Sequence, residues 1–126
     1  MRVLGLGIDL ISLSRARQFL KENRPRAINR LLTHPEKRRL RNKSLTSLQF
    51  SKMFAAKEAF FKASGESWMG LEGFRSLEVK FLAHDKFQVR SLKPNRFATL
   101  KHREVIGRFF HNGIFLGAQV ILYSKD

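Results

Sequence analysis

Two carboxylates in this chain stand where a carboxylate needs a partner, and the first is Asp9. It interrupts the apolar run Val3–Ile11, which has the length and composition of a buried strand and no helix caps. An acid within such a run requires a metal, another cation or several hydrogen-bond donors. Gly5 and Gly7 remove side chains just before it, which suits a close backbone neighbour or a ligand. The alternative is that Asp9 ends the strand and caps the helix that follows.

The second carboxylate is Glu58, in the stretch Phe50–Gly65. Alanines, long side chains and the lack of proline predict a helix here. On the helical period, Glu58 and Lys62 continue an apolar stripe that starts at Phe50 and includes Phe54. Charges at the end of an apolar stripe are either a surface ion pair or part of a site.

Capping signals predict the elements that precede this helix. Ser12 or Ser14 is suited to cap a helix that starts near Arg15. Thr33-His-Pro-Glu36 has the form of a capping box with proline in the first turn, and it opens a second helix rich in basic residues. Ser47 is the predicted cap of the central helix.

Alternating apolar residues and turn signals predict antiparallel strands in the second half of the chain. The predicted segments are strands at Arg75–Leu82, Phe87–Leu92, Glu104–Phe110 and Ile114–Tyr123, a helix at Asn95–His102, and a loop around Trp68–Gly73 that is either a surface turn or a lid over a ligand. With the first strand they predict one α+β domain, residues 1–126, whose first-half helices pack on an antiparallel sheet.

Composition narrows the class of protein. The chain has 126 residues, of which 43% are hydrophobic and 12 are phenylalanine, and this favours a folded globule. It has no cysteine, so disulfides, thiolate metal sites and thiol catalysis are excluded. No apolar run is long enough to span a membrane and the N-terminus does not resemble a signal peptide, so we expect a cytoplasmic protein.

The net charge predicts an acidic partner. The chain has 25 basic and 10 acidic residues, a formal net charge of +15, and most of the excess lies between Arg15 and Arg41. Nucleic acid is the commonest partner of a small, very basic protein, so a nucleic-acid-binding module with structural carboxylates is the alternative to an enzyme. The aromatic residues, however, follow core spacing, and no RNA-binding motif is present.

Two motifs together carry a resemblance to a known family. Gly7-Ile8-Asp9, followed further along by Lys57-Glu58-Ala59-Phe60-Phe61-Lys62, resembles the Gly-x-Asp strand and Lys-Glu-Ala-x-x-Lys helix of the holo-acyl-carrier-protein synthases, the small phosphopantetheinyl transferases. The resemblance runs from residue 2 to about residue 123 and is strongest before residue 66. It implies the phosphopantetheinyl transferase fold and transfer of 4'-phosphopantetheine from coenzyme A to a serine of an apo-acyl-carrier protein.

The resemblance also assigns residues to this reaction, which displaces one phosphate from another. Asp9 and Glu58 would hold one Mg²⁺ against the pyrophosphate, because a hard cation prefers oxygen ligands and screens both phosphates. Lys62 would place its ammonium on the same phosphates, unless it is only the ion-pair partner of Glu58. Gly65 would let the backbone approach the nucleotide, unless it only ends the helix.

His111 aligns with the histidine of a family Ser-x-x-His-like segment on the penultimate hairpin, and would lie near the phosphates or the carrier serine; otherwise it is a turn residue. The base that deprotonates the serine stays open among Glu58, a water on the metal and His111. Arg15 occupies the position of a recurrent arginine that receives the acidic carrier protein, and the neighbouring bases would steer that partner. The family usually assembles as a trimer with its active site between adjacent subunits, so a homotrimer is also implied.

The sequence departs from the family at two places that bear on binding. Met53 stands where the family commonly has an arginine that can meet phosphate. Arg108-Phe109-Phe110 replaces the small, hydroxyl-bearing residues that usually precede the histidine. Both departures leave the proposed metal pair whole.

Overall fold

The computed structural model describes residues 1–65, 71–92 and 103–125. Its helices and strands are β1 (Arg2–Ser12), α1 (Leu13–Leu31), α2 (His34–Arg39), α3 (Ser47–Ser64), α4 (Leu71–Arg75), β2 (Leu77–Phe81), β3 (Lys86–Ser91), β4 (Arg103–His111) and β5 (Phe115–Ser124). The predicted helix at Asn95–His102 and most of the loop around Trp68–Gly73 lie outside the described residues.

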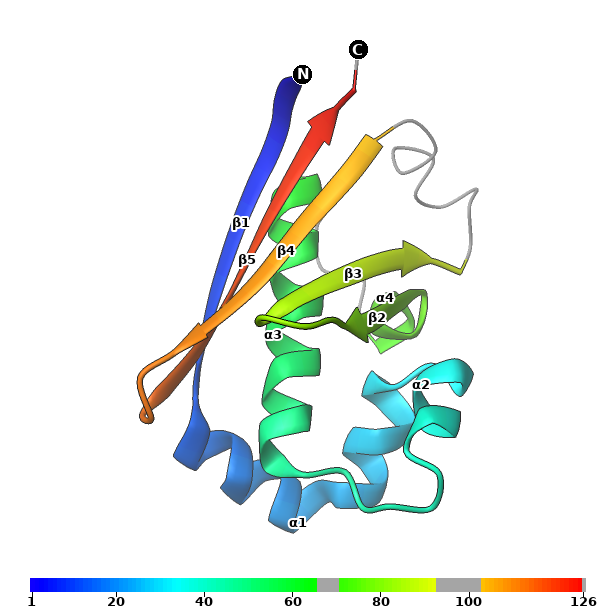
Figure 1. Cartoon of the computed structure of the whole chain (residues 1–126). Coiled ribbons are helices and arrows are strands. Elements are labelled where there is room, and N and C mark those ends of the chain that lie inside the picture. Colours follow the sequence, from blue (N-terminus) through cyan, green and yellow to red (C-terminus); the bar gives the residue numbers. More distant parts are fainter. Residues whose placement is uncertain (66–70, 93–102, 126) are drawn as a thin grey trace.

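The strands form one antiparallel sheet in the order β1-β5-β4-β3-β2. The first and last strands therefore lie side by side, with both termini at the same end of the sheet (Figure 1). Both predicted hairpins, β2–β3 and β4–β5, are present. The predicted α+β class is confirmed, with the helices of the first half on one face of the sheet.

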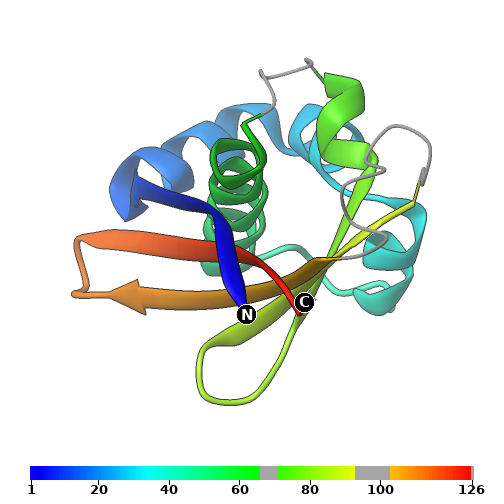
Figure 2. The same cartoon turned by 90° about the horizontal axis from the view of Figure 1, so that it is seen from above.

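Helix α3 is the centre of the fold. Figure 2 shows it end-on, between the sheet and α1. Its inner side is formed by alanines and phenylalanines, of which Ala55, Ala59 and Phe60 are fully buried. Small residues on this side let the helix approach the sheet closely, and the large ones fill the space at its edges. The backbone of α3 therefore has a fixed position relative to β1 and β5.

The N-cap of α3 is Thr46, so the prediction of Ser47 was wrong by one residue. Thr46 has extended backbone angles, and its hydroxyl accepts a hydrogen bond from the amide of Gln49 at 3.0 Å. The Gln49 side chain returns a bond to the amide of Thr46, also at 3.0 Å. Glutamine at the third helical position completes the box from Thr46, whereas a box from Ser47 would need Glu or Gln at position 50, which is phenylalanine.

The other predicted caps are confirmed. Ser12 caps α1 and accepts a bond from the amide of Arg15 at 3.4 Å. Thr33 and Glu36 form the predicted capping box of α2. Helix α1 is kinked at Asn23, whose φ is −132°, two residues before Pro25. The kink matches the restriction that proline places on the residues before it.

The apolar run of β1 predicted a strand that is buried on both faces, but in the structure only one face is covered. It is an edge strand of the sheet, and Leu6, Ile8 and Leu10 on its outer face are 54%, 47% and 61% exposed. The helices cover only the inner face, toward which Gly5 and Gly7 point. In the part of the chain that the structure describes, none of the helices combines the length and apolar composition needed to cross a membrane.

Candidate active site

The site is built where β1 and α3 meet, and two glycines set how closely they meet. A Cβ atom on Gly7 would lie 1.9 Å from the carbonyl oxygen of Ala59, and one on Gly5 would lie 1.9 Å from that of Ala63. Backbone therefore packs directly on backbone, which is one of the two alternatives that the glycines in the sequence allowed. Asp9 is the next residue on the same inner face of β1, since side chains alternate along a strand.

Lys62 links α3 to this carboxylate. Its ammonium donates to Oδ1 of Asp9 at 3.0 Å and to the backbone carbonyl of Ile8 at 3.1 Å. The side chain of Asp9 is 13% exposed and that of Lys62 is 52% exposed, so the ion pair is partly open to solvent. The alternative to a phosphate contact was that Lys62 pairs with Glu58; the ion pair that the structure gives it is with Asp9.

Asp9 and Glu58 form a region of surplus negative charge. Oδ2 of Asp9 is buried and makes no hydrogen bond to any residue that the structure describes. Burial raises the pKa of Glu58, the charge of Asp9 raises it further, and Lys62 lowers it in part. Two carboxylates close enough to repel each other, one with an unsatisfied oxygen, make a site that a cation would stabilise.

The donor set fits a hard cation such as Mg²⁺. Among residues 1–65, 71–92 and 103–125, no group of three or more acidic, histidine or cysteine side chains is arranged to hold a metal. Mg²⁺ does not require such a cage, because it is commonly bound by one or two carboxylates and completes its shell with water and substrate phosphates. Asp9 and Glu58 therefore match the expected number and kind of protein ligands.

Three further predicted residues, Gly65, Arg15 and His111, have no hydrogen bond or ion pair with the side chains of Asp9, Glu58 or Lys62 in the part of the chain that the structure describes. Gly65 ends α3 with φ +71°, and a Cβ there would have nothing within 4 Å, so its backbone angle is what requires glycine. Arg15 is exposed in the first turn of α1. His111 ends β4 and pairs with Leu116 of β5. Strand β5 runs between β4 and β1, so His111 is two strands away from Asp9 within the chain.

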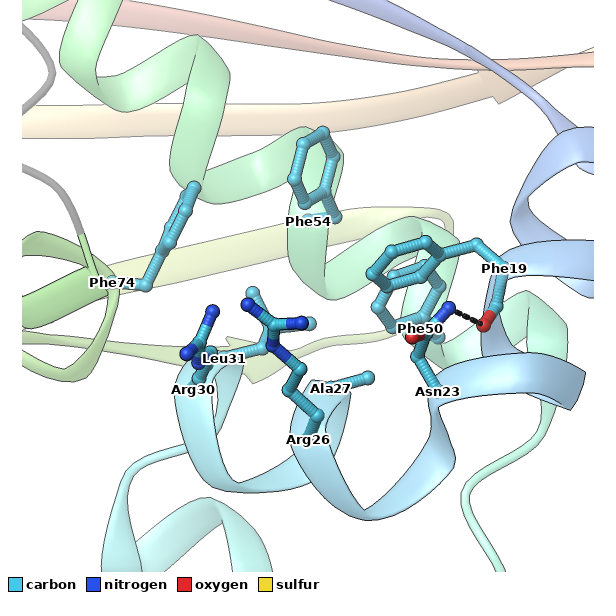
Figure 3. A pocket seen from close by; sticks show the side chains of 9 residues that line it. All are labelled: Phe19, Asn23, Arg26, Ala27, Arg30, Leu31, Phe50, Phe54 and Phe74. Carbon is cyan, nitrogen blue, oxygen red and sulfur yellow. Dashed lines mark hydrogen bonds between the residues drawn. The ribbon is translucent and has the colours of Figure 1, made fainter.

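A pocket lies between α1, α3 and α4, and we call it the α1–α3 pocket (Figure 3). It has a volume of about 290 Å³ and is lined by Phe19, Asn23, Arg26, Ala27, Arg30, Leu31, Phe50, Phe54 and Phe74. Phenylalanine rings form its walls, and Figure 3 shows the guanidinium groups of Arg26 and Arg30 pointing from α1 toward Phe54 and Phe74. An apolar cavity with two cations at its edge suits an apolar group that carries a nearby negative charge.

The sequence reasoning missed the buried ion pair of Lys57 and Glu36. Their side chains are fully buried, and Nζ of Lys57 lies 2.8 Å from Oε1 of Glu36. Helical spacing contained a signal for it, because Lys57 stands four residues after Met53 and four before Phe61, which are both buried. Met53 itself is 7% exposed, so the residue that replaces the family's arginine belongs to the core.

Comparison with known proteins gives one consistent result. Residues 5–115 match the family described as the 4'-phosphopantetheinyl transferase superfamily. The holo-[acyl-carrier-protein] synthase of Geobacter metallireducens is 30% identical over 125 residues, which cover 95% of this chain and 97% of that protein.

Two solved structures have folds similar to that of this chain. The crystal structure of the Neisseria meningitidis holo-[acyl-carrier-protein] synthase has a TM-score of 0.82 at 24% identity and covers 97% of this chain and 99% of its own, which supports the fold. The Bacillus anthracis synthase, solved in complex with CoA (3',5'-ADP), has a TM-score of 0.73 at 29% identity and covers 99% of this chain and 100% of its own.

Proposed function

This chain belongs to the 4'-phosphopantetheinyl transferase superfamily, among its holo-[acyl-carrier-protein] synthases, and we propose that Asp9, Glu58 and Lys62 form the centre at which it works. The chain transfers the 4'-phosphopantetheine group of coenzyme A to a serine of an apo-acyl-carrier protein. The observation that carries the assignment of the centre is the unsatisfied Oδ2 of Asp9, next to a second carboxylate and an ammonium.

Each residue of the centre has a task in this proposal. Asp9 and Glu58 would hold Mg²⁺, which would screen the negative charge of the pyrophosphate of coenzyme A. Lys62 is half exposed and reaches the centre from α3, so its ammonium is available to a phosphate as well as to Asp9. Gly65, at the end of the same helix, offers backbone without a side chain to the nucleotide. These residues bind and orient the phosphates, which is most of what phosphoryl-type transfer asks of a protein.

The carrier protein is proposed to bind along α1. Arg15 stands in the first turn of this helix, and the α1–α3 pocket opens farther along it, with Arg26 and Arg30 at its edge. An acidic helix with one apolar side chain would pair its carboxylates with these arginines and insert the apolar group between the phenylalanine rings. A cytoplasmic location is part of the same proposal.

The outer face of the sheet supports the proposed homotrimer. Leu6 of β1 and Ile106 of β4 are both strand partners of Ile121 in β5, and Ile106 is 49% exposed. In the same way, Leu10 and Phe110 are both partners of Gly117, and Phe110 is 44% exposed. An exposed apolar face of this kind is typical of an interface between subunits. Because β5 separates His111 from Asp9 within one chain, we propose that His111 serves the Asp9–Glu58 centre of a neighbouring subunit.

Transfer by the intact protein tests the assignment of the centre. Coenzyme A, Mg²⁺ and an apo-acyl-carrier protein are mixed with the protein, and the mass gained by the carrier is followed by intact mass spectrometry. Asp9→Asn, Glu58→Gln and excess chelator should each abolish the gain. Glu104→Gln is the matched control. Glu104 is a surface carboxylate on strand β4, and it pairs with Lys125 at 3.0 Å. Transfer by Asp9→Asn and Glu58→Gln at the parent rate would refute the proposed centre.

Subunit mixing tests the placement of His111. His111→Ala and Asp9→Ala proteins are each expected to be inactive, and a mixture allowed to exchange subunits should regain a measurable fraction of the parent activity. Light scattering on the same samples should give three times the mass of the chain. A mixture that exchanges subunits and stays inactive would place His111 and Asp9 in the site of the same chain.

A further inference from the structure

Lys57 is the residue before Glu58, but it points to a different, buried side of the helix. Its ammonium donates to the backbone carbonyl of Leu31 at 2.6 Å, to that of Phe74 at 2.9 Å and to Oε1 of Glu36 at 2.8 Å. An ammonium has three hydrogens, and this geometry gives a separate acceptor to each. The side chain is fully buried, so water does not compete for these three hydrogen bonds.

Glu36 extends the connection to a further element. Its Oε1 also accepts a bond from the amide of Thr33 at 2.8 Å, and its Oε2 accepts one from the amide of Val79 at 2.6 Å. The pair therefore joins the end of α1, the start of α2, the middle of α3, the end of α4 and strand β2. Residues from distant parts of the sequence meet at one buried ion pair.

Stability alone is a weak reason for such a pair. Apolar residues of similar volume often fill a buried position equally well, because they avoid removing two charges from water. Burial lowers the pKa of Lys57 to about 8, against the attraction of Glu36. What an apolar pair cannot supply is directed hydrogen bonds to carbonyls at the ends of two helices, which fix where those ends lie.

The two carbonyls that Lys57 holds belong to walls of the α1–α3 pocket. Leu31 and Phe74 both line it, and the ring of Phe74 lies 5.6 Å from that of Phe54, three residues before Lys57 on α3. We propose that Lys57 and Glu36 are positioning residues that hold the ends of α1 and α4 on α3, so that the pocket keeps the shape that the carrier protein binds. This inference rests on the proposed function, since the carrier is the proposed occupant of the pocket.

The test is the double variant Lys57→Met with Glu36→Gln. It removes both charges together, so no unpaired buried charge is left to unfold the protein, and the glutamine oxygen can still accept a hydrogen bond from one of the two amides that Glu36 holds, that of Thr33 or that of Val79. We expect a cooperative thermal transition, a KM for apo-acyl-carrier protein raised at least fivefold, and a KM for coenzyme A within twofold of the parent. Hydrogen exchange should become faster at the amides of residues 28–32 and 73–76, and stay unchanged in the β4–β5 hairpin.

Glu78→Gln is the matched control, because Glu78 also ties α2 to the sheet. It accepts from Arg39 of α2 at 3.1 Å and from Arg90 of β3 at 2.9 Å, and it does not line the α1–α3 pocket. This variant should keep the parent KM for the carrier. An unchanged KM for the carrier in the double variant, or an equal rise in both KM values, would overturn the proposal.

Hydrogen exchange separates this inference from the proposed function. If the parent protein transfers nothing in the assay, the proposed function fails, and the positioning role is then judged by exchange alone. Faster exchange confined to the ends of α1 and α4 supports it. Unchanged exchange in the double variant refutes it, whatever the enzyme activity.

Discussion

Replacing Gly7 by alanine should separate the geometry of the site from the stability of the fold. The new Cβ would lie 1.9 Å from the carbonyl oxygen of Ala59 and 2.7 Å from the amide nitrogen of Ala63, and both are helix backbone that no side-chain rotation can move. Ordinary contact begins near 3.4 Å, so β1 and α3 must move apart by about 1.5 Å at this point. Asp9, two residues along β1, moves with the strand.

Such a shift should affect transfer far more than folding. Overpacking of this kind costs about 1–3 kcal/mol, which a domain of this size tolerates. A displacement of about 1 Å between reacting groups costs on the order of 100-fold in rate. The distance of 3.0 Å between Lys62 and Asp9 is the contact most directly strained. We therefore expect a folded Gly7→Ala protein whose kcat/KM for transfer is lower by about 100-fold.

Gly107→Ala is the control, because Gly107 lies in the same row of the sheet, two strands away from Gly7. Its Cβ would meet the ring of Phe87 at 2.4 Å, so this variant is also overpacked, although against a side chain and not against backbone, and the contact between β1 and α3 is untouched. Thermal unfolding and transfer kinetics are measured on both variants. If Gly7→Ala transfers within threefold of the parent, or if both variants lose activity in proportion to their stability, the reasoning is wrong.

Three further predictions follow from the same contacts. With chelator present, raising the pH from the ordinary pKa of 4.5 through the raised pKa of Glu58 should lower the free energy of unfolding of the parent relative to that of Glu58→Gln. The reason is that the folded state favours the protonated carboxyl group, which loses its proton in this range. Parallel curves of unfolding free energy against pH, measured by chemical denaturation, would contradict this. Lys62→Met should lower transfer at least tenfold while changing stability by no more than about 1 kcal/mol, since the Lys62 side chain is half exposed; equal transfer in steady-state assays would remove Lys62 from the site. Thr46→Ala should cost about 1 kcal/mol in thermal unfolding and Ser47→Ala much less, and the reverse order would show that the cap is misassigned.

Local signals in the sequence located most of the elements. The capping box of Thr33 and Glu36 was predicted because its partners are three residues apart and the pattern is short. The same Glu36 also bonds to Lys57 and to Val79, and those contacts join segments that only the tertiary fold brings together. The capping pattern therefore identified Glu36 but gave no sign of its contacts with Lys57 and Val79.

Strand β1 shows the opposite limit. Its uninterrupted apolar run predicted a strand covered on both faces, and within the chain only the inner face is covered. An apolar run of this kind indicates that both faces of the strand will be buried, but it does not show which segment or subunit covers each face. If the homotrimer forms through the outer face, the run was a correct signal of burial whose partner lies in another copy of the chain, which a single-chain interpretation cannot supply.

Asp9 is a residue that folding alone does not explain. A carboxylate that is 13% exposed, with one oxygen bonded to Lys62 and the other left without a donor among the described residues, is costly for the fold by itself. Replacing it with an apolar residue would remove that cost, so folding gives no reason to place it on the inner face of β1 beside a second acid. The two glycines that bring α3 onto this strand add a further constraint, because they admit no side chain and give up the burial one would provide. A bound cation would account for the two carboxylates together, since it would satisfy the free oxygen of Asp9 and offset the repulsion between Asp9 and Glu58.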